Sequence, residues 1–192
     1  MFLRQCLLAC CLLLGTGLTA QSSRHLDERL DAYARATENN CPDELLACLD
    51  PELFDYVPRQ LLAAQLEAQR TTKDVEVTVT DFTVDQIGKK ITEAGTAYVP
   101  VRCHHDLNFR LRTAAARNAE AFAGLTEVFT ERYGAAAVST DAEDFVITVR
   151  VRKQLYAIDR GEGYHFIEHT PGAAGVLDLL VPLSVRERLT GY

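Results

Sequence analysis

Residues 99–111 of the chain read VPVRCHHDLNFRL, and this stretch decides the fold. Side chains of two kinds alternate along it. One set of alternate positions holds Val99, Val101, Cys103, His105, Leu107, Phe109 and Leu111. The other set holds Tyr98, Arg102, His104, Asp106, Asn108, Arg110 and Arg112. Successive side chains of a strand point to opposite faces of a sheet, so we predict a long antiparallel strand with one buried face and one face in water.

Shorter strands are predicted around this one. They cover residues 75–80, 145–152, 155–159 and 164–168. Residues 145–152 and 155–159 form either two strands or one bent strand. A hairpin turn at 160–163 leads into residues 164–168. Turns are expected at 88–90 and 94–96. From the apolar faces of these elements and of a long helix, we expect a core that includes Val101, Leu107, Phe109, Phe122, Phe129, Phe145 and Ile147.

Helical spacing occupies the remaining segments. Leu26, Leu30 and Tyr33 recur every three or four residues, which places them on one face of a helix over residues 25–38. A further helix is expected to begin at residue 41, and a short turn is expected at residues 50–56. The remaining helices are expected over residues 57–70, 114–133, 176–180 and 185–189. The fold class is therefore α+β. No linker or charge block divides residues 21–192, so we expect a single domain.

Residues 1–20 have the three regions of a secretory signal peptide: Arg4, an apolar run over residues 6–14, and small residues at Thr19 and Ala20. We therefore expect cleavage near Ala20 and export to the periplasm or the extracellular space. A membrane anchor needs about 20 apolar residues, and this run is shorter. The alternative of a lipoprotein attached at Cys10 would leave only residues 5–9 as the signal core, which is too short. No membrane span is expected in the mature chain.

Charge and cysteine content limit the function further. The whole chain has a net charge of -7 and no basic block, so we do not expect nucleic-acid binding. Beyond the predicted signal peptide the cysteines are Cys41, Cys48 and Cys103, too few for a disulfide scaffold. Cys41 and Cys48 are about 10 Å apart along one helix. Either all three thiols are free, or Cys103 pairs with one of the other two.

Cys103 and His105 share the apolar face of the long strand. A thiol beside an imidazole is the residue pair of a nucleophilic site. The simpler interpretation is a buried cysteine and a core histidine whose ring nitrogens are bonded to backbone or to a hydroxyl, and we favour it. These two residues are the only catalytic candidates that we retain.

Other polar patterns are weaker. His104 and Asp106 share the opposite face, where we expect both to be solvated. His104, His105, His165 and His169 do not have the spacing of a metal site, so we predict no metal and no cofactor. Arginines gather at Arg102, Arg110, Arg112 and Arg117, with Arg150 and Arg152 on another strand. They form either a patch that binds an anion or a partner, or a solvated sheet face.

The beginning of the chain resembles a known superfamily. The pattern Leu26-x3-Leu30-x2-Tyr33, the helix over residues 45–49 and the step Pro51-Glu52-Leu53-Phe54 before Pro58 carry this resemblance, over residues 25–112. They are similar to the nuclear-transport-factor-two-like superfamily, also called cystatin-like or SnoaL-like cones, as found in secreted bacterial proteins. The resemblance implies N-terminal helices packed on a curved, cone-like antiparallel sheet. The helix at 114–133 is then an addition between strand pairs.

This superfamily contains enzymes, small-molecule binders and protein-binding modules, so the fold does not choose the function. We favour an exported, non-catalytic domain that binds a partner protein or a small apolar ligand, and a homodimer is compatible with it. The alternative is a small cone-fold enzyme, a hydrolase or isomerase, with a pocket near His105.

Overall fold

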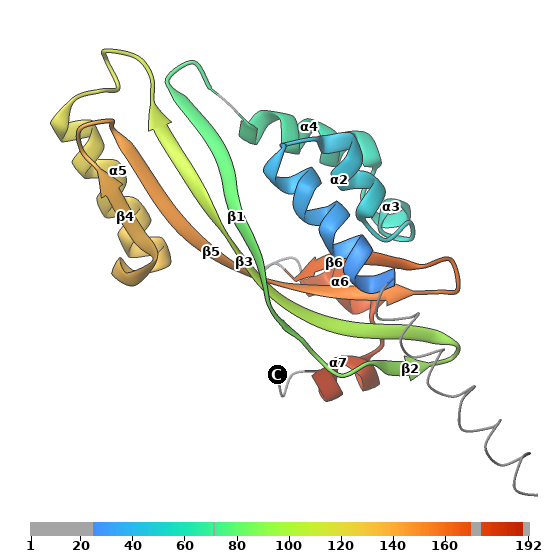
Figure 1. The fold of residues 1–192 in the computed structure, drawn as a ribbon. Coiled ribbons are helices and arrows are strands. Elements are labelled where there is room, and N and C mark those ends of the chain that lie inside the picture. The colour runs from blue at the N-terminus through green and yellow to red at the C-terminus, as the bar shows by residue number, and fades with distance from the viewer. Residues whose placement is uncertain (1–24, 71, 170–173, 190–192) are drawn as a thin grey trace, which may run out of the picture.

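The computed structural model describes residues 25–70, 72–169 and 174–189. Helices pack against a six-stranded antiparallel sheet that curves along its length and is not closed (Figure 1). The predicted α+β class is confirmed. The predicted signal peptide, residues 1–20, and the alternative lipidation site at Cys10 lie outside the described residues. No helix in the described part of the chain combines the length and the apolar character needed to cross a bilayer.

The N-terminal helices lie together on one side of the sheet (Figure 1). They are the helix over residues 25–38, α2 (Pro42–Cys48), α3 (Leu53–Tyr56) and α4 (Arg59–Arg70). The first helix buries Leu26, Leu30 and Tyr33, as their spacing predicts. Pro42 stands at the first turn of α2, where a residue without an N–H costs nothing.

The two central strands of the sheet pair with each other without a shift in register. Its strands are β1 (Val75–Ile87), β2 (Ile91–Glu93), β3 (Thr96–Leu111), β4 (Val138–Asp141), β5 (Val146–Asp159) and β6 (Tyr164–His169). The order is β1-β3-β5-β4, with β2 paired to β3 and β6 paired to β5. β5 is one continuous strand, which resolves the alternative left open by the sequence. The sequence does not predict β2 or β4, because strands of 3 and 4 residues are too short to show an alternation.

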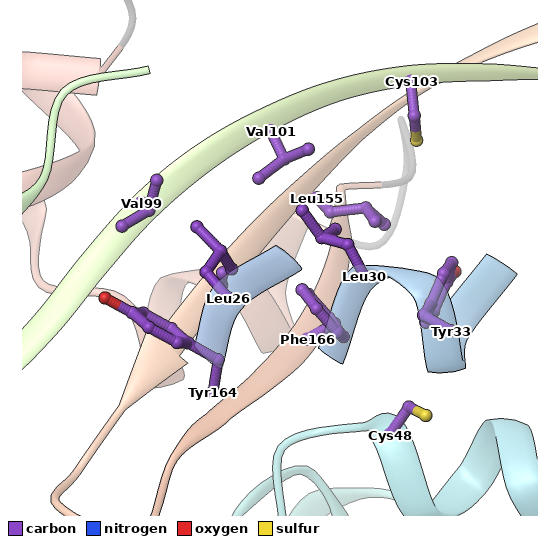
Figure 2. Close-up of a cluster of buried hydrophobic side chains, with 11 residues drawn as sticks. Leu26, Leu30, Tyr33, Cys48, Val99, Val101, Cys103, Leu155, Tyr164 and Phe166 are labelled. Atoms are coloured by element: carbon purple, nitrogen blue, oxygen red, sulfur yellow. The ribbon is translucent and has the colours of Figure 1, made fainter. Parts of the chain in front are cut away.

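The two faces of β3 are covered differently along its length. Val99, Val101 and Cys103 lie under the helix over residues 25–38 (Figure 2). On the opposite face, Tyr98 and Tyr156 are buried under α6 (Ala174–Leu180) and α7 (Leu183–Leu189). The prediction that this opposite face lies in water is therefore wrong at this end of the strand, where the C-terminal helices cover it.

The other end of the sheet packs against α5 (Ala119–Tyr133), which the short helix η1 (Ala135–Ala137) joins to β4. There the rings of Phe109 and Phe129 stack with 4.5 Å between their centroids. α5 begins later than the predicted residue 114 because Asn118 is its N-cap. The Asn118 side chain accepts a hydrogen bond from the amide of Ala121 at 2.8 Å.

Part of the predicted core is fully buried. Val101, Phe122 and Ile147 are buried as expected, whereas Leu107, Phe109, Phe129 and Phe145 are only partly buried. The three partly buried phenylalanines belong to the cluster under α5. One helix covers that end of the sheet, so water reaches the margins of this cluster.

Candidate functional site

His105 and Cys103 are both buried on the face of β3 that carries the predicted apolar set. His105 exposes 2% of its surface. The ring of Phe82, from β1, lies nearly parallel to the imidazole, with 6.3 Å between ring centroids and 8° between ring planes. The predicted placement of these two residues on the buried face is therefore confirmed. The imidazole is covered by an aromatic ring, which is the packing of a core residue.

A β-bulge in β1 turns Phe82 toward the imidazole. At this bulge Asp81 and Phe82 together stand opposite the single residue His105. Asp81 has a positive φ of 58°. Bulges of this kind change the direction in which a strand presents its side chains. The Phe82 amide donates a hydrogen bond to Oε1 of Glu38 at 2.9 Å, so the helix over residues 25–38 holds the bulge in place.

The environment keeps both candidate catalytic groups neutral. Burial lowers the pKa of His105 to about 4, and the charge of Lys153 acts in the same direction. Its Nδ1 is buried and has no hydrogen-bond partner among the described residues, so the expectation that both ring nitrogens are bonded is wrong for Nδ1. Burial raises the pKa of the Cys103 thiol to about 12. A Cys/His nucleophile needs a thiolate and a hydrogen-bonded base, and this pair shows neither.

Three more polar side chains meet beside Cys103. Nζ of Lys153 lies 3.0 Å from Oε2 of Glu168, and Tyr33 lies close to the same carboxylate. Burial raises the pKa of Tyr33 well above its ordinary value, and the charge of Glu168 adds to the shift. Sequence reasoning missed this group, because its members come from the first helix, β5 and β6. The predicted hairpin at 160–163 was a usable signal for the approach of Lys153 to Glu168.

The cysteines are unpaired in the described structure. Cys48 and Cys103 are buried and Cys41 is half-buried, and all three are free thiols. Figure 2 shows Cys103 on β3 and Cys48 on α2, on opposite sides of the helix over residues 25–38. Of the two alternatives for the cysteines, the structure corresponds to three free thiols.

His104 and Asp106 each contact another side chain directly. Nδ1 of His104 lies 2.7 Å from Oδ1 of Asp85, on β1. Asp106 accepts two hydrogen bonds from the Arg150 guanidinium, at 2.9 and 3.0 Å, and these lower the pKa of its carboxyl. Asp106 exposes only 8% of its surface, so the expectation that it is solvated is wrong. The guanidinium of Arg150 lies over it instead.

The structure divides the predicted arginine cluster. Arg102 and Arg110 of β3 and Arg150 and Arg152 of β5 alternate onto the same sheet face and are exposed. We call these four residues the arginine face. Arg117 instead lies over the ring of Phe145, at 5.2 Å from the ring centroid, and Arg112 follows the end of β3.

Hydrogen-bonded polar side chains lie beside the arginine face. Nδ2 of Asn108 donates to Oγ1 of Thr80 at 3.0 Å, and the Thr148 hydroxyl donates to Oδ1 of Asn108 at 2.8 Å. A hollow of about 180 Å³ beside Arg150 is lined by Asp106, Ala136, Ala137, Val138, Ser139, Thr148 and Arg150 itself. On this face, Arg150, which Asp106 holds in place, therefore borders a shallow depression.

Metal ligands do not come together in the described residues. No group of three or more histidine, cysteine, aspartate or glutamate side chains there is arranged to hold a metal ion. His165 and His169 both lie on β6, where the ring of His169 contacts Tyr156 at 6.2 Å between centroids. In comparisons with known proteins, no family model and no curated protein matches this chain.

Proposed function

We propose that this chain is an exported, non-catalytic binding protein that holds an acidic partner protein on its arginine face. The observation that carries the proposal is the gathering of four exposed arginines on one sheet face of a chain whose net charge is -7. We further propose that the chain is a member of the nuclear-transport-factor-two-like superfamily, which the helix over residues 25–38 and the curved sheet support.

Two of the four charges on this face are available to a partner. Arg150 is engaged by Asp106, but Arg102 and Arg152 have no ion pair among the described residues. Across the sheet, Arg102 lies opposite Gln86 and Gln154, which are uncharged, and Arg152 lies opposite His104. Arginine is enriched in protein interfaces because its planar guanidinium pairs well with carboxylates.

The sheet edge beside these arginines is also open. In the described residues, β4 pairs with β5 up to Val149 and β6 pairs with β5 from Gln154. Among the described residues, 150–153 therefore pair with β3 alone. Their outer backbone groups can hydrogen-bond to an extended segment of a partner, which is one of the recurrent modes of peptide recognition.

The interior favours a protein partner over a small apolar ligand. The space between the first helix and the sheet is filled by Leu26, Leu30, Tyr33, Val101 and Phe166, which form one buried cluster (Figure 2). The enzyme alternative rests on His105, which is enclosed by Phe82 and kept neutral. Surface recognition therefore accounts for more of the observed geometry than chemistry in the interior does.

The test measures binding of a poly-glutamate peptide to the mature protein by NMR titration at low and at physiological salt. We expect the largest amide shifts around Arg102 and Arg152 and an affinity about tenfold lower in Arg102→Gln/Arg152→Gln. The matched control, Arg35→Gln/Arg132→Gln, removes two positive charges elsewhere and should bind as the wild type does. Equal losses in the two double variants would refute the proposal, because they would show a response to net charge alone.

Sedimentation of the same proteins shows whether the acidic partner is a second copy of this chain. A wild-type dimer that dissociates in Arg102→Gln/Arg152→Gln, but not in the control, identifies a homodimer. His105→Leu should bind the peptide as the wild type does. A weaker binding in His105→Leu would contradict the assignment of the site to the arginine face.

A further inference from the structure

We propose that a second site, a hollow between the β1–β2 turn and α7, binds a small phosphate-bearing molecule. The hollow has a volume of about 380 Å³ and is lined by Lys89, Lys90, Ile91, Thr92 and Arg188. Pockets that take small molecules begin at about 300 Å³. Three of its five lining residues are cationic, although the chain as a whole is acidic. None of them belongs to the arginine face.

The turn that carries the two lysines is anchored to the sheet. The amide of Gly88 donates a hydrogen bond to the carbonyl oxygen of Pro100 at 2.8 Å. A Cβ atom at Gly88 would lie 2.5 Å from Cγ of Pro100, so only glycine allows this approach. On the other side of the lysines, Ile91 pairs with Tyr98 of β3. Lys89 and Lys90 are therefore held between two fixed points and are not carried on a loose loop.

Arg188 is positioned independently from α7. Its Nε donates to the carbonyl oxygen of Ser184 at 3.1 Å, and its Nη2 donates to Oε2 of Glu93 at 3.2 Å. The Ser184 hydroxyl donates to the same carboxylate, at 2.6 and 2.7 Å from its two oxygens. These contacts fix the guanidinium and leave N–H donors that they do not use.

The charges in the hollow do not cancel. Glu93 is an acidic group beside it, and its carboxylate is already bonded to Arg188 and Ser184. Lys89 and Lys90 have no ion pair among the described residues. Two ammonium groups and a fixed guanidinium around one hollow match the several oxygens and the charge of a phosphate.

The test is calorimetric titration of the mature protein with inorganic pyrophosphate, with the amide signals of Ile91 and Thr92 followed by NMR. We expect saturable binding of one equivalent, weakened at least about tenfold in Lys89→Gln/Lys90→Gln. Both lysines are exposed, so this variant should fold and melt as the wild type does. The control Lys73→Gln/Arg35→Gln removes the same charge elsewhere and should keep the wild-type affinity.

Three results would overturn the proposal: no saturable binding at millimolar pyrophosphate, equal weakening in the control, or amide shifts that avoid residues 89–92. Sulfate at the same ionic strength should compete poorly if the site selects phosphate, and equal competition would reduce it to a general anion site. Arg102→Gln/Arg152→Gln should bind pyrophosphate normally. This outcome separates the second site from the proposed function of the arginine face.

Discussion

The buried imidazole of His105 should make the fold less stable as the pH falls below 6.5. The pKa of this group is about 4 in the folded protein, whereas an ordinary histidine has a pKa of 6.5. Between these pH values the unfolded chain takes up a proton that the folded chain does not. Stability therefore rises with pH across this window and is lost as the pH falls through it. The full difference corresponds to about 3 kcal/mol.

Replacement of His105 by leucine isolates this contribution. Leucine has a similar volume, does not titrate and removes the buried Nδ1 that has no partner among the described residues. At pH 7 we expect His105→Leu to be as stable as the wild type or about 1 kcal/mol more stable, because an unpaired buried polar atom is costly. At pH 4.5 the advantage of the variant should grow by about 2 kcal/mol.

The assay is urea unfolding followed by far-ultraviolet circular dichroism at several pH values between 7 and 4.5. The control is His165→Gln, which removes a half-buried histidine on β6 and shows whether a changed pH dependence is specific to His105. Parallel stability curves for wild type and His105→Leu would refute the reasoning, because they would mean that the imidazole protonates equally well in the folded state. A loss above about 2 kcal/mol at pH 7 would show that Nδ1 makes a stabilising contact.

Two further substitutions test how the sheet is tied to its surroundings. Asp50→Ala removes a buried carboxylate that accepts a hydrogen bond from the Glu52 amide at 3.0 Å and pairs with Arg160, so it should cost about 2 kcal/mol in urea unfolding. Gly88→Ala places a methyl group 2.5 Å from the ring of Pro100, so thermal melting should show a loss of about 1–3 kcal/mol, and an unchanged melting temperature would contradict this packing.

The alternation along residues 99–111 is enough to predict the central strand and the class of the fold. A period of two identifies which side chains share a face, and His105 and Cys103 do lie on the buried one. It does not identify what covers the other face. Tyr98 occupies a position in the polar set, and its burial depends on α6 and α7, which are distant in the sequence. The sequence pattern of a short amphipathic helix does not show which part of the sheet the helix packs against.

The candidate site is less predictable than the fold, because its contacts cross between elements. At the bulge the apolar positions of β1 shift from 75, 77 and 79 to 82 and 84, beyond the end of the strand predicted over residues 75–80. The stacking of Phe82 on His105 joins two strands, so it is not visible in the pattern of either one. The arginine face was partly visible. Strand alternation groups Arg150 with Arg152, but only the β3–β5 register brings them beside Arg102.

The uninterrupted pairing of β3 with β5 explains why a histidine can occupy this position. One face of β3 carries Val101 under the first helix and Phe109 under α5, in two separate clusters. His105 lies between these two points along the strand, beside Phe82, which packs against the first cluster. β3 pairs with β5 without a shift in register, but two different helices cover this face of it. A junction between the two helix-covered parts therefore remains on the face. The bulge places the ring of Phe82 there, nearly parallel to the neutral imidazole of His105.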